Sequence, residues 1–265
     1  MTGNGQRIAI VGGRGKTGRA VASAVEAAGA ETVPVGRAEL GDLAATLRGC
    51  DAVYLIAPNL HPDEPAFVTD ILDAMREAGV GRIGYHSVCA PYVPSMPHHL
   101  AKAASEDLVR RSGLEWTILE PCAYVDNFLP GLRAASPRLE VPYDADRPFG
   151  LVGLEDLGAV AARVLLDPSH IGATYEVGGR RLVTARDVVA AAQRVLATTV
   201  ELVVTSPDQW AAGPGASLDP RERDWLHAMF SYYEDHGLPC GSTTVPAVLG
   251  RPAQDLDTLL RHALV

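Results

Sequence analysis

Three glycines near the start of the chain have the spacing of a loop that binds phosphate groups. Gly12, Gly15 and Gly18 directly follow the apolar run IAIV and open an alanine-rich stretch with a helical pattern. In such a unit the first glycine permits a tight turn, the second lets backbone N–H groups approach a pyrophosphate, and the third lets the helix pack closely on the sheet. No Gly-Lys-Ser/Thr follows at the spacing of a nucleoside-triphosphate loop. The pattern predicts dinucleotide binding; the alternative is a merely structural turn.

The residues after the second apolar run indicate which dinucleotide binds. An acidic residue at this place bonds the ribose 2′-hydroxyl of NAD, whereas an arginine accommodates the 2′-phosphate of NADP. Here the run ends in VGR, with Arg37 last, and the first carboxylate comes only at Glu39. Arg14 and Lys16 add positive charge from the glycine loop. We therefore predict NADP(H) with Arg37 at the 2′-phosphate; the alternative is that Arg37 is a solvated loop charge.

Polar residues in two later segments could polarise a carbonyl group or move a proton. Ser87 closes the run RIGYHS at a strand's carboxyl end, where open parallel sheets bind ligands, and we favour it for a hydrogen bond to a substrate oxygen. His98 and Lys102 are four residues apart and share one face of a helix. His98 would act as an acid at neutral pH if its neighbours raise its pKa above the ordinary ~6.5. Alternatively, His98 decorates the first helical turn and Lys102 merely pairs with Glu106. His99 is expected at the surface.

Other side chains would shape a substrate pocket. Tyr124 and Asn127 are expected at its rim, and Phe128 as an apolar wall. For the late aromatic residues we favour packing of a helical lobe over ligand contact; they are Trp210, Trp225, Phe230, Tyr232 and Tyr233. The four cysteines form no CxxC pair, so we expect buried reduced thiols and no metal site.

These residues need a sheet to position them. Apolar runs alternate with helical patterns in the first half, which is typical of βαβ units with both sheet faces covered. The expected strands are 7–11, 32–35, 52–57, 82–87 and 116–121, and the expected helices 17–28, 41–47, 64–78 and 98–112. The sequence therefore predicts an α/β fold with a doubly wound parallel sheet.

The second half adds one more unit and then becomes mainly helical. A helix over 152–166 and a strand over 173–177 extend the sheet, and Thr184 with Asp187 marks the start of a helix over 184–196. A strand over 200–205 and helices over 219–236 and 254–264 follow. We expect a cofactor-binding core over 1–150, and the last core unit plus a smaller, mainly helical substrate lobe over 151–265, with the two lobes interleaved.

The composition excludes several classes of protein. The 265 residues are 47% hydrophobic, enough for a folded core, and carry a formal net charge of −9. An acidic chain lacks the electrostatic footprint of a nucleic-acid-binding protein. There is no apolar run of ~18 residues for a membrane span, and the start lacks the features of a signal peptide. We expect a cytoplasmic protein whose partner is a small molecule.

Seven segments, taken in order, resemble the atypical short-chain dehydrogenase/reductase family, in particular its NmrA-like and quinone-oxidoreductase-like members. The segments are IVGGRGKTGR, DAVYLIAP, GRIGYHSV, HHLAKAASEDLVRRSGLEWTILEP, AYVDNFL, VGLEDLGAVAARVLLDP and GATYEVGG, which together span nearly residues 7–180. The C-terminal part matches only in general character. The Ala-, Arg- and Gly-rich composition resembles that of proteins from high-GC bacteria, where such reductases often act on aromatic polyketides. Among the family's members, the chain most resembles angucyclinone-type ketoreductases without the usual tyrosine.

The resemblance implies a Rossmann-type domain that binds NADP(H), with a small lobe closing over the nicotinamide. It places Gly12, Arg14, Gly15, Lys16, Thr17 and Gly18 at the phosphates, Arg37 at the 2′-phosphate, Ala57 and Pro58 on the adenosine side, Lys102 at the nicotinamide ribose, and Pro121 and Cys122 beside the nicotinamide. The wider superfamily uses Ser and Tyr-x-x-x-Lys for catalysis. Ser87 and Lys102 are present here, but His98 stands where the tyrosine is expected.

The leading hypothesis is an NADPH-dependent reductase that acts on a ketone or quinone of an apolar molecule, a polycyclic aromatic polyketide being the type suggested by the resemblance. The proton would come from His98 or from the substrate itself. The alternative from another class is a non-catalytic NADP(H)-binding redox sensor of the NmrA type, for which a missing tyrosine is expected. A redox-neutral epimerase or dehydratase is a third hypothesis.

Overall fold

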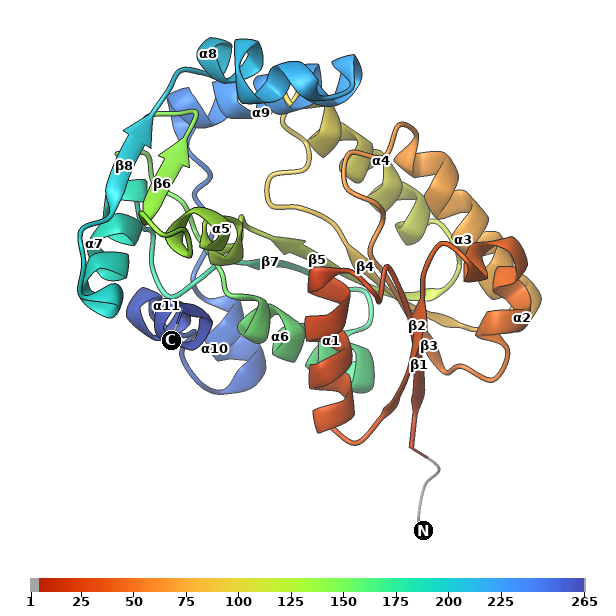
Figure 1. Cartoon of the computed structure of the whole chain (residues 1–265). Coiled ribbons are helices and arrows are strands. Elements are labelled where there is room, and N and C mark those ends of the chain that lie inside the picture. Colours follow the sequence, from red (N-terminus) through yellow and green to blue (C-terminus); the bar gives the residue numbers. More distant parts are fainter. Residues whose placement is uncertain (1–4, 265) are drawn as a thin grey trace.

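The centre of the molecule is a six-stranded sheet with the order β2-β1-β3-β4-β5-β7 (Figure 1). All neighbouring strands are parallel. The strands are β1 (Arg7–Val11), β2 (Glu31–Val35), β3 (Ala52–Leu55), β4 (Arg82–His86), β5 (Glu115–Pro121) and β7 (Thr174–Val177). This computed structural model describes residues 5–264; residues 1–4, where a targeting segment would begin, and residue 265 lie outside the described residues. The predicted doubly wound parallel sheet is confirmed.

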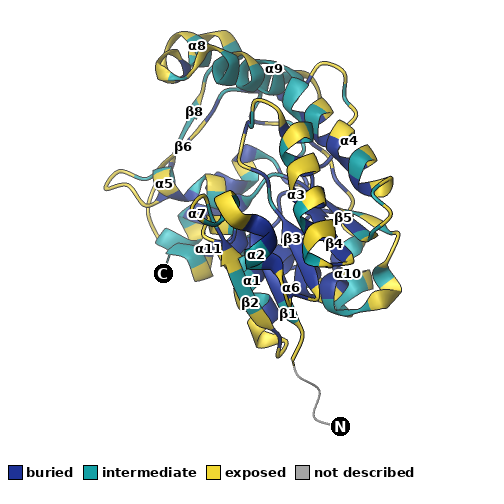
Figure 2. Cartoon of the chain, turned by 90° about the vertical axis from the view of Figure 1, so that its right-hand side faces the viewer, coloured by how far each residue is buried: buried dark blue, intermediate teal, exposed yellow. Residues whose placement is uncertain are grey.

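Helices cover both faces of this sheet. Helices α1 (Lys16–Ala27) and α6 (Leu154–Leu166) pack together on one face, where Gly158 allows close approach: a Cβ there would lie 2.6 Å from the carbonyl oxygen of Ala20. Helices α2 (Leu43–Leu47), α3 (Glu64–Ala78) and α4 (Pro97–Arg110) cover the other face. Every residue of β3 and β4 is consequently buried (Figure 2), as their continuous apolar runs predict.

Local capping explains where the helices begin. The capping box predicted at Thr184 is present, with Asp187 as its reciprocal partner. The helix expected over 41–47 is divided in two: a 3₁₀ turn covers Glu39–Asp42 and α2 starts only at Leu43. The reason is that the Asp42 side chain accepts a hydrogen bond from the Ala45 N–H and so acts as the N-cap of α2.

A second lobe is built around a two-stranded parallel sheet of β6 (Arg138–Val141) and β8 (Glu201–Val204). Its helices are α5 (Leu129–Leu132), α7 (Ala185–Leu196), α8 (Pro207–Ala212), α9 (Pro220–His236) and α11 (Leu256–Leu264), whereas α10 (Thr244–Leu249) packs against α6 and β7 of the main sheet. Sequence patterns miss β6, α5, α8 and α10, because such short segments show no clear periodicity. The lobe's core is aromatic: the rings of Tyr143, Phe149 and Tyr233 pack edge to face or tilted.

The chain interleaves the two lobes. It forms α5 and β6 first, then returns to the main sheet with α6 and β7, and goes back to the lobe with α7. Helix α9 thereby comes to lie across the carboxyl-end side of the sheet, facing α4 (Figure 1). All four cysteines are buried and free, as predicted. No helix within residues 5–264 combines the length and the apolar character that crossing a membrane requires.

Candidate functional site

A large cavity lies between the carboxyl ends of the strands and the second lobe. Its volume is about 1170 Å³, above the ~300–1,000 Å³ typical of a site for one small ligand. Every site residue predicted from the sequence lines it: Gly12, Arg14, Gly15, Lys16, Thr17, Gly18, Arg37, Ala57, Pro58, Ser87, His98, Lys102, Pro121, Cys122, Tyr124, Asn127 and Phe128. The fold therefore brings together segments that are far apart in the sequence, with room for two molecules.

The glycine loop has the geometry of an anion site. Gly12 has φ +78° and leaves no space for a side chain, since a Cβ there would lie 2.7 Å from the carbonyl oxygen of Ile56. A Cβ on Gly18 would come within 2.3 Å of the Gly12 carbonyl oxygen. Helix α1 begins after Gly15 with neither a side-chain cap nor an acidic residue in its first turn. Its N-terminal N–H groups and dipole are therefore suited to a phosphate group.

The positive charges around this loop are not equivalent. The Arg14 guanidinium pairs with Glu39 at 2.5 Å, and the other carboxylate oxygen of Glu39 accepts the Gly36 N–H at 2.8 Å. The Gly36 N–H, together with Arg14, lowers the pKa of Glu39 against the effect of burial. Arg37 is exposed, lines the cavity and has no ion pair with another residue of the 5–264 range. Of the two arginines, Arg37 is thus the one available to a second phosphate.

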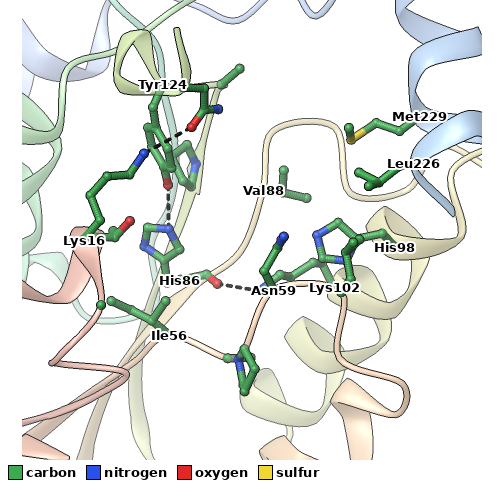
Figure 3. A pocket seen from close by; sticks show the side chains of 18 of the residues that line it. Lys16, Ile56, Asn59, His86, Val88, His98, Lys102, Tyr124, Leu226 and Met229 are labelled. Atoms are coloured by element: carbon green, nitrogen blue, oxygen red, sulfur yellow. Dashed lines mark hydrogen bonds between the residues drawn. The ribbon is translucent and has the colours of Figure 1, made fainter. Parts of the chain in front are cut away.

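Lys102 is fixed by groups from two other elements. Its Nζ lies 2.7 Å from Glu64 Oε1 on α3 and donates to the His86 carbonyl oxygen at 3.1 Å (Figure 3). The Tyr85 hydroxyl donates to the same Glu64 oxygen at 2.6 Å. The alternative that Lys102 pairs with Glu106 is therefore wrong. Tertiary packing places the α3 carboxylate closer than the neighbour one helical turn away.

Ser87 is in the cavity wall, but its hydroxyl is already engaged. The side chain is buried, and its Oγ donates to Glu106 Oε1 at 2.5 Å. Glu106 also accepts from Arg110 at 2.8 Å. In this arrangement the Ser87 proton points to the α4 carboxylate, away from a substrate oxygen.

His98 and His99 correct two expectations. Burial, reinforced by the positive charge of Lys102, lowers the pKa of His98 to about 3, so its neighbours do not raise that value. His98 is therefore neutral at pH 7 and is no imidazolium acid. His99 was expected at the surface but is buried, with Nδ1 3.1 Å from the Ala90 carbonyl oxygen. The loop before α4 and helix α9, whose Trp225 ring lies 6.4 Å from that of His98, enclose this end of the cavity.

A chain of hydrogen bonds that sequence reasoning missed lies on the opposite side of the cavity. His86 Nδ1 is 2.8 Å from the Tyr54 hydroxyl, and its Nε2 is 2.8 Å from the Tyr124 hydroxyl (Figure 3). Burial, followed by the charge of Lys102, lowers the pKa of His86 to about 3. Tyr54 lies next to the end of β3 and His86 ends the neighbouring β4; because Tyr54 pairs with Gly84, the two side chains point to the same face of the sheet. The alternation of side chains along each strand could have predicted that these two side chains share a face. That prediction requires knowing that β3 pairs with β4, which the sequence alone does not show.

The rim and the outer wall combine polar and apolar groups. Lys16 donates to Asn127 at 3.2 Å and so connects the glycine loop to the predicted rim. Trp210, Phe230 and Tyr233 line the cavity and also pack in the lobe, whereas Trp225 and Tyr232 are not among its lining residues. Leu226 and Met229 of α9 face the cavity opposite Tyr124 (Figure 3). Within residues 5–264 no His, Cys, Asp and Glu cluster could hold a metal ion.

Comparison with known proteins agrees with this geometry. A family model described as NAD(P)H-binding matches residues 18–168. A curated relative from Streptomyces griseus, (4-alkanoyl-5-oxo-2,5-dihydrofuran-3-yl)methyl phosphate reductase, is 32% identical, and the match covers 97% of this chain and 98% of the relative.

Two solved structures share the fold across almost the whole chain. An NADPH-dependent quinone oxidoreductase from Escherichia coli, solved with NADPH, superposes with a TM-score of 0.81 at 21% identity and covers 96% of this chain and 99% of its own. Nmra, a negative transcriptional regulator, superposes with a TM-score of 0.78 at 18% identity over 98% and 96% of the two chains. The predicted resemblance to NmrA-like and quinone-oxidoreductase-like proteins is thereby confirmed at the level of the fold.

Proposed function

Because the chain belongs to the NAD(P)H-binding family and to its NAD(P)H-dependent reductases, we propose that it is an NADPH-dependent reductase of conjugated carbonyl groups, such as a quinone or an unsaturated ketone, in an apolar molecule. One observation carries this proposal. A single cavity joins the uncapped N-terminus of α1, where a dinucleotide's phosphates fit, to an apolar wall formed by α8 and α9.

The residues present fit a nicotinamide dinucleotide. The glycine loop has no side chains that would block the close approach of a pyrophosphate to the backbone. Arg37 is available for a 2′-phosphate. Lys102 is held at the sheet's edge, where it can bind a ribose hydroxyl. Glu39, the nearest carboxylate after β2, is occupied by Arg14 and by the Gly36 N–H, so it does not compete for a ribose. When bound, the reduced nicotinamide supplies two electrons and one hydrogen as hydride. We infer a preference for NADPH over NADH.

The groups facing the cavity favour a conjugated acceptor. His98 is neutral and the Ser87 proton is engaged, so no strong acid is available at their side of the site. A quinone or an unsaturated ketone spreads the negative charge that hydride addition creates, and so depends less on an acid than an isolated ketone does. The Streptomyces griseus relative is named for a conjugated furanone bearing an alkanoyl group. A polycyclic aromatic ketone of the polyketide type is the finer form of the proposal, supported by Trp210 and Phe230 in the wall.

To test this proposal, the purified protein is mixed with NADPH and each member of a panel of acceptors. The oxidation of NADPH is measured as the loss of its nicotinamide absorbance. We expect turnover of apolar quinones and unsaturated ketones and little turnover of saturated ketones of the same size. Tight NADPH binding with no turnover of any acceptor would contradict the proposal and favour the redox-sensor alternative. Faster reduction of saturated ketones would refute the conjugated-acceptor class.

A further inference from the structure

We propose that Tyr124 takes the place of the missing catalytic tyrosine: its hydroxyl donates a proton to the acceptor's carbonyl oxygen, and the buried pair Tyr54–His86 orients it. This inference rests on the proposed function. It gives roles to Tyr54 in β3, to His86 at the end of β4 and to Tyr124 in the loop after β5, which belong to none of the sequence motifs used for catalysis in the wider superfamily.

The protonation state of His86 follows from its burial. The imidazole is buried at the end of β4, and the low pKa that burial causes keeps it neutral at pH 7. A neutral imidazole donates from one ring nitrogen and accepts at the other. Both nitrogens are bonded to tyrosine hydroxyls at 2.8 Å, Nδ1 to Tyr54 and Nε2 to Tyr124. One tyrosine must therefore donate to the ring and the other must accept from it.

The environment of Tyr54 decides between the two tautomers. Its side chain is fully buried, and within residues 5–264 its hydroxyl has His86 as its hydrogen-bond partner and no other. If Nδ1 carried the hydrogen, the Tyr54 hydroxyl hydrogen would be buried without an acceptor, which is the more costly arrangement. Tyr54 therefore donates to Nδ1, and the Nε2–H group donates to the Tyr124 oxygen.

This tautomer frees the hydroxyl hydrogen of Tyr124. Because the Tyr124 oxygen accepts from His86, its own hydrogen must point elsewhere, and the half-buried side chain lines the cavity. Burial raises the pKa of Tyr124, so the phenol is protonated at neutral pH, while the neighbouring Thr17 side chain acts in the opposite direction. The Nζ of Lys16 lies 5.8 Å from the ring centre. The oxygen thus keeps the hydrogen bond from His86 Nε2–H, which stabilises it as its proton leaves.

The step balances in atoms and charge. The acceptor gains two electrons and one hydrogen as hydride from the reduced cofactor, and its carbonyl oxygen gains the proton as the Tyr124 O–H bond breaks. Water entering the cavity then returns a proton to the phenolate. His86 and Tyr54 keep their hydrogens throughout, so they are positioning residues and Tyr124 is the catalytic one.

The first experiment compares Tyr124→Phe with Tyr175→Phe. Tyr175 forms the same kind of bond, 2.8 Å from its hydroxyl to His170 Nδ1, but outside the cavity. For Tyr124→Phe we expect kcat to fall on the order of 10²-fold, the scale of general acid catalysis, with the Kd for NADPH unchanged and a lower unfolding midpoint, because the buried Nε2–H group of His86 loses its acceptor. Tyr175→Phe should keep its kcat. Undiminished kcat in Tyr124→Phe would overturn the proposal.

The second experiment determines the tautomer of His86 and does not depend on enzyme turnover. ¹⁵N NMR of the His86 ring in the cofactor-free protein should show a protonated Nε2 and an unprotonated Nδ1; the opposite tautomer would overturn the proposal. In Tyr54→Phe both tautomers leave Nδ1 unpaired, so the preference should be lost and kcat should fall less than in Tyr124→Phe. If the wild-type protein reduces no acceptor, the proposed function is wrong. The NMR measurement still tests the hydrogen-bond chain, because it does not depend on turnover.

Discussion

Single side chains around the glycine loop differ in what they can offer to a ligand. The sequence presents Arg14, Lys16 and Arg37 as one positive cluster, but the structure divides them. Glu39 neutralises Arg14, and Lys16 reaches over to Asn127. Arg37 is exposed at the cavity and forms no ion pair with any residue that the structure describes. Charge count alone would therefore overestimate the positive potential, and under the proposed function we expect Arg37 to determine the cofactor choice.

Arg37→Ala should weaken NADPH binding and leave NADH binding unchanged. A hydrogen-bonded contact between a guanidinium and a phosphate contributes ~1.5–3 kcal/mol, so we expect the Kd for NADPH to rise by about ten- to a hundredfold. The measurement is a titration of nicotinamide fluorescence with each cofactor.

Arg186→Ala is the matched control for this substitution. Arg186 is also an exposed arginine, but it pairs with Asp146 away from the cavity. An unchanged NADPH Kd in Arg37→Ala would refute the assignment of Arg37 to the 2′-phosphate and leave it as a solvated loop charge.

At the scale of elements, the strand–loop–helix unit from β1 to α1 depends on a close approach of backbones. Gly18, in the first turn of α1, packs against the carbonyl oxygen of Gly12 and the Cα of Gly13. Both nearest groups are backbone atoms, so they cannot move aside as a flexible side chain would. The position of α1's N-terminus relative to the sheet therefore follows from the absence of a side chain.

Gly18→Ala should shift α1 away from the loop and weaken the anion site. We expect a loss of ~1–3 kcal/mol in the free energy of unfolding, as for overpacked cores, together with weaker binding of NADPH and NADH alike. Urea unfolding and cofactor titration measure the two effects.

Gly41→Ala serves as the control, because a Cβ there meets nothing within 4 Å and its φ is not in the left-handed region. A Gly18→Ala protein as stable as Gly41→Ala would show that α1 can move at no cost, contrary to this account.

At the scale of the whole molecule, the closure of the second lobe over the sheet removes titratable groups from water. His86, His98 and His99 have pKa values lowered to about 3, 3 and 4, with burial as the largest cause in each case. Glu120 on β5 shows the opposite effect of burial on an acid: its pKa is raised to about 8, with nearby Glu106 adding to the shift. Folding therefore changes proton binding across the acidic range.

The histidines make folding less favourable as the pH falls. Their folded pKa values lie below the ordinary ~6.5, so the stability is complete above pH ~6.5 and is lost as the pH falls towards the folded values. Each histidine contributes up to ~1.4 kcal/mol per pH unit in this range. Glu120 acts in the other sense, since its stabilising protonated form is lost as the pH rises through about 8.

Comparing variants isolates one histidine from these opposing effects. His98→Asn should reduce the drop in unfolding free energy between pH 7 and pH 5, measured by urea unfolding, relative to the wild-type protein. His98 is a suitable site because its buried Nδ1 has no hydrogen-bond partner to lose. His262→Asn, a substitution of an exposed histidine, should leave the slope unchanged. Equal slopes in all three proteins would show that His98 is not buried in the neutral form.

The sequence by itself determined the sheet, its order of βα units, the glycine loop and part of the cavity lining. These follow from local periodicity, from glycine's freedom at Gly12 and Gly18, and from the rule that parallel strands bring their carboxyl ends to one edge. Short elements such as β6 could not be predicted, because their stability comes from a partner strand far along the chain.

The tertiary structure alone decided the protonation states and the hydrogen-bond partners. Lys102 pairs with Glu64 instead of Glu106, His98 is neutral, and Tyr124 faces the cavity with His86 behind it. A pKa depends on how much water is removed and on which charges come near, and a partner depends on distances between elements. Both are set by how α3, α4 and α9 pack around the sheet, which no local pattern in the chain records.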